Sequence, residues 1–172
     1  MKSIKHIRLY KLCREAEGYL ELGLPKLAIS TLTRLDDKTI RRYPRLLLLK
    51  GEALRQLHLF QSAIICFREL NRKKEFALLH SLIASCYKNL GQFDKAALSM
   101  KRALELEPNS GIHHFNLACY YSLLGYKYRT LEELSTAVDL DRNIGKLIKS
   151  VPDFDSLRND PDFIQTVQTI AS

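Results

Sequence analysis

A pattern of four residues that returns about every thirty-four positions constrains the fold of this chain more than any other feature. It consists of a small residue, an aromatic residue or leucine, a turn residue, and a second small residue. A fixed period of this length is typical of stacked helical repeats, which bury one continuous core between neighbours. The four copies are Ala16, Tyr19, Gly23 and Ala28; Gly51, Leu54, His58 and Ala63; Ala84, Tyr87, Gly91 and Ala96; and Ala118, Tyr121, Gly125 and Thr130.

Each copy predicts two amphipathic helices joined by a tight turn. In the third copy, Ile83 and Tyr87 share one helical face, and Phe93 and Met100 share the next. Gly91 lies between them, where a left-handed residue commonly ends a helix. The small residues allow the paired helices to approach to about 8–10 Å. The sequence therefore predicts an all-α fold built from antiparallel helix pairs.

The chain resembles the tetratricopeptide repeat family, most closely in the third copy, which ends in Leu106, Glu107 and Pro108. The fourth copy is nearly as close, with Thr130 where the family usually has alanine. The first two copies depart further, because His58 replaces glycine, neither copy ends in proline, and a small residue is replaced by Leu35 and Leu70. The resemblance implies a right-handed superhelical solenoid of antiparallel helix pairs.

We predict a single domain over residues 1–172, with repeats at about 9–43, 44–76, 77–110 and 111–144 and a C-terminal cap at 145–172. The composition, 46% hydrophobic and 27% charged, is that of an ordinary globular protein. No apolar run approaches the roughly 18 residues of a membrane span. The four cysteines form no Cys-x-x-Cys pair, which favours reduced thiols over disulfides or a zinc site. We expect a cytoplasmic protein.

The segment after the last repeat has its own pattern. Pro152 and Pro161 each lie where a helix would begin, and Phe163, Val167 and Ile170 then recur at helical spacing. The segment resembles the tail containing aspartate, phenylalanine and proline that follows the last repeat in many bacterial tetratricopeptide repeat proteins. An open array must cover the apolar face of its last repeat. We predict that the segment caps the array; the alternative is a tail that docks elsewhere.

The resemblance also implies a binding surface. In arrays of this family, the first helix of each pair lines a concave groove that commonly holds an extended peptide or a partner's helix. Apolar side chains at these positions favour a partner with apolar side chains, although Leu49 and Leu82 can instead pack between repeats. The matching positions here are Tyr10, Cys13, Arg14, Glu17, Arg45, Leu48, Glu52, Arg55, Leu78, Ser81, Ser85, Lys88, Ile112, Phe115, Asn116, Cys119 and Leu123.

The residues at these positions argue against one known binding specialisation of the family. Family members that grip the carboxylate at the end of a heat-shock chaperone use a set of lysines, asparagines and an arginine on successive groove helices. Only Asn116 fits that set here, and asparagine at this position is common in the family generally. We therefore do not expect a chaperone-tail clamp.

Positive charge is concentrated in the first half of the chain. The net charge is +8, and residues 1–75 contain 17 Lys and Arg against 8 Asp and Glu, whereas residues 76–172 contain 10 against 11. Two inter-repeat junctions carry a basic edge that can attract an acidic protein, RNA or anionic lipid. The alternative is solvated loops, and the scarcity of aromatic residues there argues against sequence-specific RNA binding. The basic edge comprises Lys38, Arg41, Arg42, Arg72, Lys73 and Lys74.

No residue pattern indicates catalysis. His113 and His114 are adjacent and point to different faces of a helix, and no glycine-rich phosphate loop or nucleophile motif is present. We predict a non-enzymatic interaction module or chaperone-like scaffold, without cofactor or metal, that binds a peptide or helix of a partner protein. The alternatives are a binder of an anionic partner through the basic edge and a secretion-type chaperone.

Overall fold

The computed structural model describes residues 2–72 and 74–170, and every regular element within these ranges is a helix. The all-α fold class predicted from the sequence is therefore confirmed. The chain divides into two compact units, an N-terminal unit (Met1–Glu75) and a C-terminal unit (Phe76–Ser172). Each unit contains two of the predicted helix pairs, and the single domain over residues 1–172 stays a prediction.

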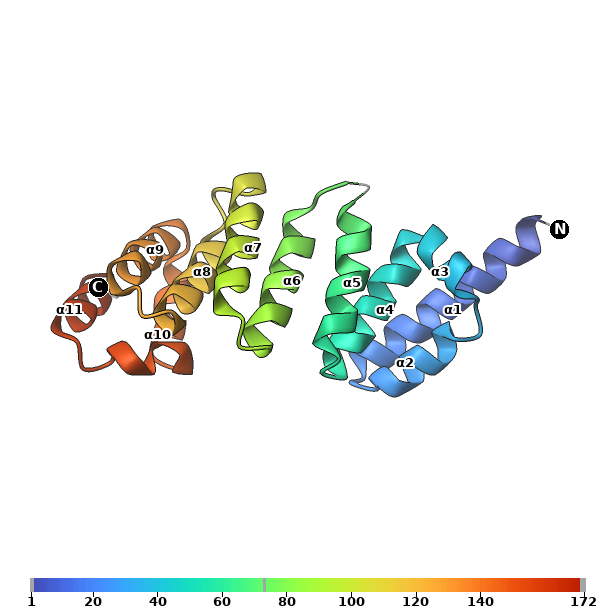
Figure 1. The fold of residues 1–172 in the computed structure, drawn as a ribbon, viewed down its shortest axis with the longest axis horizontal. Helices are drawn as coiled ribbons and strands as arrows, with labels where there is room; N and C mark the ends of the chain where they lie inside the picture. The colour runs from blue at the N-terminus through green and yellow to red at the C-terminus, as the bar shows by residue number, and fades with distance from the viewer. Residues whose placement is uncertain (1, 73, 171–172) are drawn as a thin grey trace. The chain divides into compact units, whose positions relative to one another are not determined.

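The N-terminal unit is built around two antiparallel helix pairs, α1 with α2 and α4 with α5 (Figure 1). Both helices of the first pair also pack on α4. The short helix α3, which precedes α4 in the chain, packs on α4 as well. Alanines and leucines of α1, α2 and α4 form one core, which includes Ala16, Ala28, Leu32, Leu46 and Ala53. The helices are α1 (Lys2–Glu21), α2 (Pro25–Leu32), α3 (Asp37–Arg42), α4 (Pro44–Gln56) and α5 (Phe60–Asn71).

The C-terminal unit contains the pairs α6 with α7 and α8 with α9, and α7 packs against α8 (Figure 1). The remaining elements fold back onto the last pair: α11 packs on α9, and η2 packs on α8. Phe163 and Val167 of α11 are buried, as expected for a cap, while the side chain of Ile170 lies outside the described ones. The elements are α6 (Ala77–Asn89), α7 (Phe93–Leu106), α8 (Gly111–Leu123), α9 (Lys127–Leu140), η1 (Arg142–Ile144), α10 (Gly145–Ile148), η2 (Pro152–Leu157) and α11 (Pro161–Ile170).

The turn inside each helix pair takes a left-handed residue, as the repeat pattern predicts. The φ angles are 68° at Gly23, 69° at Gly91 and 76° at Gly125. His58 adopts φ 60° at the equivalent place, although left-handed backbone is uncommon for a residue with a side chain. Its ring packs edge-on against Phe60, with 5.5 Å between the ring centroids. The turn geometry is thus kept even where glycine is missing.

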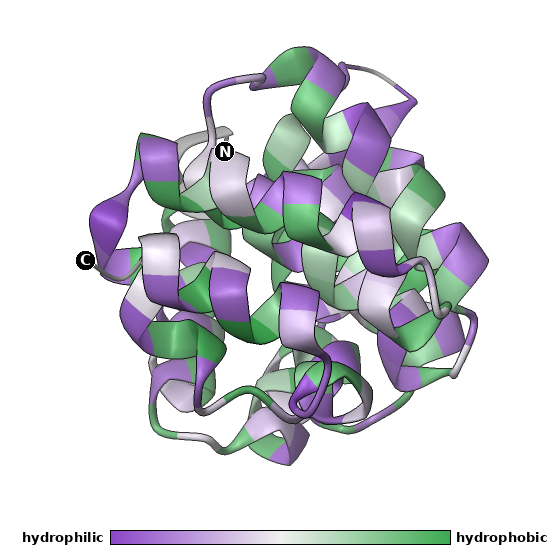
Figure 2. Cartoon of the chain, turned by 90° about the vertical axis from the view of Figure 1, so that its left-hand side faces the viewer, coloured by the Kyte–Doolittle hydropathy of each residue, from purple (hydrophilic) through white to green (hydrophobic). Residues whose placement is uncertain are grey.

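Small residues lie where the paired helices meet. Ala84 in α6 and Ala96 in α7 are completely buried. Thr130, which stands where alanine is usual, is also completely buried, and its hydroxyl donates to the carbonyl of Tyr126 at 3.1 Å. A satisfied hydroxyl avoids the penalty of burying an unpaired polar group, so threonine is accommodated here. In Figure 2, hydrophobic and hydrophilic residues alternate along individual helices, as expected for amphipathic helices packed on one side.

Two adjacent histidines at the start of α8 have different surroundings. His114 bridges two elements, with Nδ1 2.6 Å from Oε2 of Glu133 and Nε2 3.0 Å from the carbonyl oxygen of Pro108. His113 is buried, and its Nδ1 lies 3.8 Å from Oε2 of Glu107. Burial lowers the pKa of His113 below its usual value, and the Glu107 carboxylate opposes this shift. The folded protein therefore favours a neutral ring at this position.

We predict opposite effects from adding one methyl group at two helical glycines. A Cβ at Gly51 would lie 2.6 Å from Cε1 of Phe67, a ring that is completely buried and has no room to move. Gly51→Ala should lower the free energy of unfolding by about 1–3 kcal/mol through overpacking. A Cβ at Gly18 meets nothing within 4 Å, so Gly18→Ala should raise it by about 0.5–1 kcal/mol. Denaturant titrations of both variants check this, and stabilisation by both would contradict the close approach of α4 and α5.

We also predict that His113 contributes to acid destabilisation. Because its pKa is lowered in the folded state, the unfolded chain takes up a proton that the folded protein does not as the pH falls through the usual histidine value of 6.5. The stability that the neutral His113 ring contributes is therefore fully present above pH 6.5 and is lost as the pH falls below it. His113→Phe should reduce the loss of unfolding free energy between about pH 7.5 and about pH 5.5. Equal pH slopes of the unfolding free energy for wild type and His113→Phe would refute the assignment.

Candidate peptide-binding surfaces

In the N-terminal unit, the predicted groove positions lie on α1 and α4, two helices that pack against each other. Tyr10 keeps 64% of its surface exposed, and Leu48 is half-buried on α4. Leu49, in contrast, is buried in the core, which is the alternative that the sequence left open for it. The other predicted positions remain accessible: Arg14 and Arg45 are exposed, and Cys13, Glu17, Glu52 and Arg55 are half-buried.

Ion pairs fix the charged side chains on this face. Arg45 Nη2 donates to both carboxylate oxygens of Glu17, at 2.7 and 2.9 Å, and so joins α4 to α1. Arg14 Nη1 reaches the same carboxylate at 3.2 Å. On α4, the Arg55 guanidinium donates twice to Glu52, at 2.6 and 2.9 Å, and lowers the pKa of that carboxyl. The two helices therefore carry oriented ion pairs in addition to the exposed aromatic ring of Tyr10.

In the C-terminal unit, the predicted positions lie on α6 and α8 and divide into two groups. Leu78 and Ile112, each in the first turn of its helix, are exposed. Lys88, half-buried, and Phe115 and Cys119, both buried, lie closer to the C-terminal segment. Ser81, Ser85, Asn116 and Leu123 are half-buried, as is Leu82.

The burial of Phe115 corrects the expectation that it is an open anchor for a partner. Only 5% of its surface is exposed, because η2 lies against α8 and covers it. Phe154 of η2 is 0% exposed, and its ring meets that of Phe115 edge-on with 5.9 Å between the centroids. Asp153, beside it, forms a hydrogen-bonded ion pair with Lys88 of α6. In this structure, part of the predicted binding face is covered by the chain itself.

The surroundings of Cys119 disfavour a reactive thiolate. Burial, together with the negative charge of Asp153, raises the pKa of its thiol well above the usual value. A reactive cysteine needs the thiolate, which this environment disfavours. In the part of the chain that the structure describes, no group of three or more His, Cys, Asp or Glu side chains could hold a metal ion.

The basic edge lies in the N-terminal unit. Lys38, Arg41 and Arg42 of α3 are exposed, and so are Arg72 and Lys74 after α5; Lys73 lies outside the described residues. Arg41 Nη1 approaches Oε2 of Glu69 at 3.7 Å, which places α3 beside the end of α5. This contact brings the Arg41 side chain close to the end of α5, which Arg72 follows directly.

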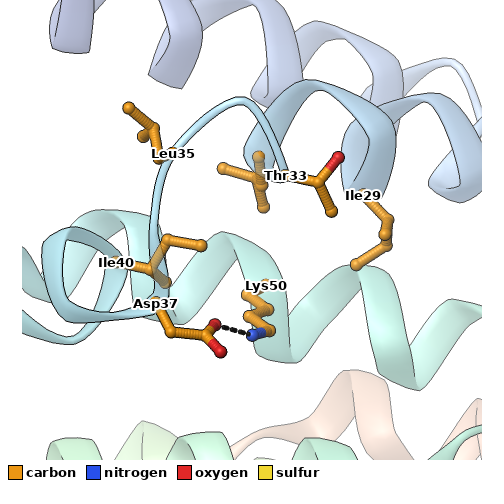
Figure 3. Close-up of a pocket in the computed structure, with 7 residues that line it drawn as sticks. Ile29, Thr33, Leu35, Asp37, Ile40 and Lys50 are labelled. Carbon is orange, nitrogen blue, oxygen red and sulfur yellow. Dashed lines mark hydrogen bonds and ion pairs between the residues drawn. The ribbon is translucent and has the colours of Figure 1, made fainter.

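The short helix α3 also creates a pocket that the sequence did not predict. Asp36 caps α3 by accepting from the backbone N–H of Thr39 at 2.7 Å. Lys50 Nζ donates to Oδ1 of Asp37 at 2.8 Å at the edge of this pocket, and this bond lowers the pKa of Asp37 (Figure 3). The volume of about 220 Å³ is below the roughly 300–1,000 Å³ of usual ligand sites, so the pocket does not indicate a small-molecule site. It is lined by Ile29, Leu32, Thr33, Leu35, Asp37, Ile40 and Lys50.

None of the helices in the described ranges is long and apolar enough to cross a membrane.

Comparisons with known proteins agree on the fold. A family model described as tetratricopeptide repeat matches residues 77–110. A MamA segment (41-end) from Desulfovibrio magneticus RS-1 is 18% identical with a TM-score of 0.76, covering 93% of this chain and 92% of that chain. A crystal structure of MamA is 19% identical with a TM-score of 0.68, covering 78% and 79% of the two chains.

YrrB, described as a tetratricopeptide repeat protein with an unusual peptide-binding site, is 14% identical with a TM-score of 0.68, covering 92% of this chain and 84% of that chain. Identities this low show the fold alone. None of the curated proteins matches the chain in sequence. Residues 77–110 thus match the tetratricopeptide repeat model, and the chain shares its helical fold with these solved structures.

Proposed function

We propose that the chain is a non-enzymatic interaction module that binds a peptide or helix of a partner protein on the α1–α4 face of its N-terminal unit. The observation that carries this proposal is the exposure of Tyr10, a large aromatic side chain at a family groove position. A tyrosine supplies much contact area at a low entropic cost and is enriched among the residues that dominate binding energy. The peptide-binding site described for YrrB supports peptide binding as an activity of this fold.

The chemistry of the face suggests how a partner is selected. Tyr10 and the half-buried Leu48 offer apolar contact, while the Glu17–Arg45 pair places a fixed positive and a fixed negative group on the same two helices. Exposed ion pairs add little net affinity, because their mutual attraction is already present in the free protein. Apolar contact therefore provides the affinity, and the charges discriminate between partner sequences.

A second candidate function rests on the basic edge. Lys38, Arg42 and Arg72 are exposed on neighbouring elements of a unit that carries most of the positive charge. Such a surface attracts acidic proteins or nucleic acids, and its affinity falls steeply as the salt concentration rises. An apolar peptide site is far less sensitive to salt, so ionic strength separates the two functions.

We predict that Tyr10→Ala weakens binding of a partner by about tenfold or more, since loss of a buried aromatic anchor costs about 2 kcal/mol. The partner would first be isolated with the tagged full chain and identified by mass spectrometry, and its affinity then measured with purified proteins. Tyr128→Ala is the matched control. Tyr128 is even more exposed than Tyr10, but it lies on α9, the second helix of its pair, whereas the proposed binding face is formed by first helices. Both variants should retain the wild-type melting temperature.

The same partner should bind with little change between low and high salt. The double variant Arg42→Glu and Arg72→Glu tests the basic edge directly. If this charge reversal abolishes binding while Tyr10→Ala leaves it intact, the groove proposal is wrong and the anionic-partner function replaces it.

A further inference from the structure

We infer that the α6–α8 face of the C-terminal unit is a binding site for an aspartate–phenylalanine pair, which Asp153 and Phe154 of the chain itself now occupy. A partner segment with the same acidic and aromatic chemistry would compete with η2 (Pro152–Leu157) for this face. The inference deepens the proposed function by naming a partner class, and it rests on first-helix faces being peptide-binding surfaces.

The acidic half of the site is Lys88. This residue occupies a family groove position on α6, and its Nζ donates to Oδ2 of Asp153. The Asp153 side chain is only 9% exposed, whereas that of Lys88 keeps 36% of its surface accessible. A carboxylate withdrawn from water to this degree requires a charged partner, so the contact selects for an acidic side chain.

The aromatic half of the site is Phe115. The Phe154 ring packs between Phe115 of α8 and Phe163 of α11, with centroid distances of 5.9 and 5.8 Å. The interplanar angle with Phe115 is 65°, within the edge-to-face geometry that aromatic pairs favour. Cys119, one turn further along α8, also faces Asp153, and both residues are buried. Two consecutive residues of η2 are thus recognised by three family groove positions.

Besides the Phe154–Phe163 contact, the capping helix has contacts that involve neither Asp153 nor Phe154. Lys127 of α9 binds Asp160 at 2.9 Å and Asp162 at 2.6 Å, and these two carboxylates raise the pKa of Lys127. Asp160 also accepts from the backbone N–H groups of Asp162 and Phe163 and so caps α11. Because α11 is anchored on α9, η2 can leave α8 while the cap stays in place.

Tethering gives the segment a large advantage over a partner. A segment joined to its site by a short linker has an effective concentration on the order of millimolar. A partner must therefore bind more tightly than the segment or meet a protein in which η2 has opened. Weakening the internal contact is expected to reveal the site.

The test uses the full chain and a fluorescein-labelled, end-blocked peptide with the sequence of residues 151–160. Fluorescence anisotropy should show weak binding to wild type and at least about tenfold tighter binding to the Phe154→Ala variant. Peptides in which the aspartate matching Asp153 is asparagine, or the phenylalanine matching Phe154 is alanine, should each lose at least about tenfold in affinity.

A charge exchange tests the acidic contact. Adding Lys88→Glu to the Phe154→Ala variant should abolish binding of the original peptide, and a peptide with lysine in place of that aspartate should restore it. Failure of the exchanged peptide to bind, with the variant still folded by circular dichroism, overturns the assignment of Lys88.

Cysteine labelling reports on the same face while Asp153 and Phe154 stay unchanged. In versions that retain only Cys119 or only Cys86, a thiol reagent should modify Cys119 at least about tenfold faster, since Cys86 is completely buried in α6 and needs wider unfolding. Excess peptide should slow the labelling of Cys119 and leave that of Cys86 unchanged. Equal rates, or no effect of the peptide, mean that η2 is an inseparable part of the core and overturn the inference.

Two controls separate this inference from the proposed function. Asp153→Asn, which keeps the phenylalanine core, replaces Phe154→Ala if that variant unfolds, and it should show the same tighter binding of the original peptide. Tyr10→Ala should not change peptide affinity, because Tyr10 lies on the other unit. If Tyr10→Ala loses partner binding and no variant binds the peptide, the inference about the α6–α8 face is overturned and the proposed function of the α1–α4 face stands.

Discussion

The close approach of paired helices at their small residues is the constraint on which the rest of the structure depends. Ala84 and Ala96 are completely buried at one such contact, and at Gly111 a Cβ would lie 2.9 Å from the carbonyl oxygen of Ala137. Because each pair closes on itself through backbone and short side chains, the longer side chains on the outer face of the first helix are not needed for pairing. They are available for a second contact, with a partner or with another part of the chain.

Features that lie within one repeat could be predicted from the sequence. The turn at His58 keeps a φ of 60° because the two helices on either side still close as a pair, so the pattern identified it even without glycine. The short helix α3 was missed although Asp36 is an ordinary capping residue and Pro44 begins the next helix. The sequence signals for α3 are local and weak. The repeat period assigns its residues to the junction between two helix pairs.

The misjudged exposure of Phe115 has a different cause. Its position in the repeat correctly places it on the first-helix face, but what covers that face is a segment outside the repeats. No periodic pattern encodes the surface on which a non-repeated segment packs, because that contact joins residues far apart in the sequence. The helical spacing of Phe163 and Val167 indicated that the segment would be buried; it did not indicate that Phe154 would meet the Phe115 ring.

Both units satisfy the charges on their first-helix faces, though by different means. In the N-terminal unit, Glu17 pairs with Arg45 on the same face; in the C-terminal unit, Lys88 pairs with Asp153 from η2. Any partner that contacts these groups exchanges one ion pair for another, which leaves little net electrostatic gain. In the proposed binding mode, affinity on either face therefore comes from apolar contact, through Tyr10 on one and against Phe115 on the other. In the same proposal the paired charges select between partners, because a partner that fails to replace the broken pair leaves a half-buried charge unpaired.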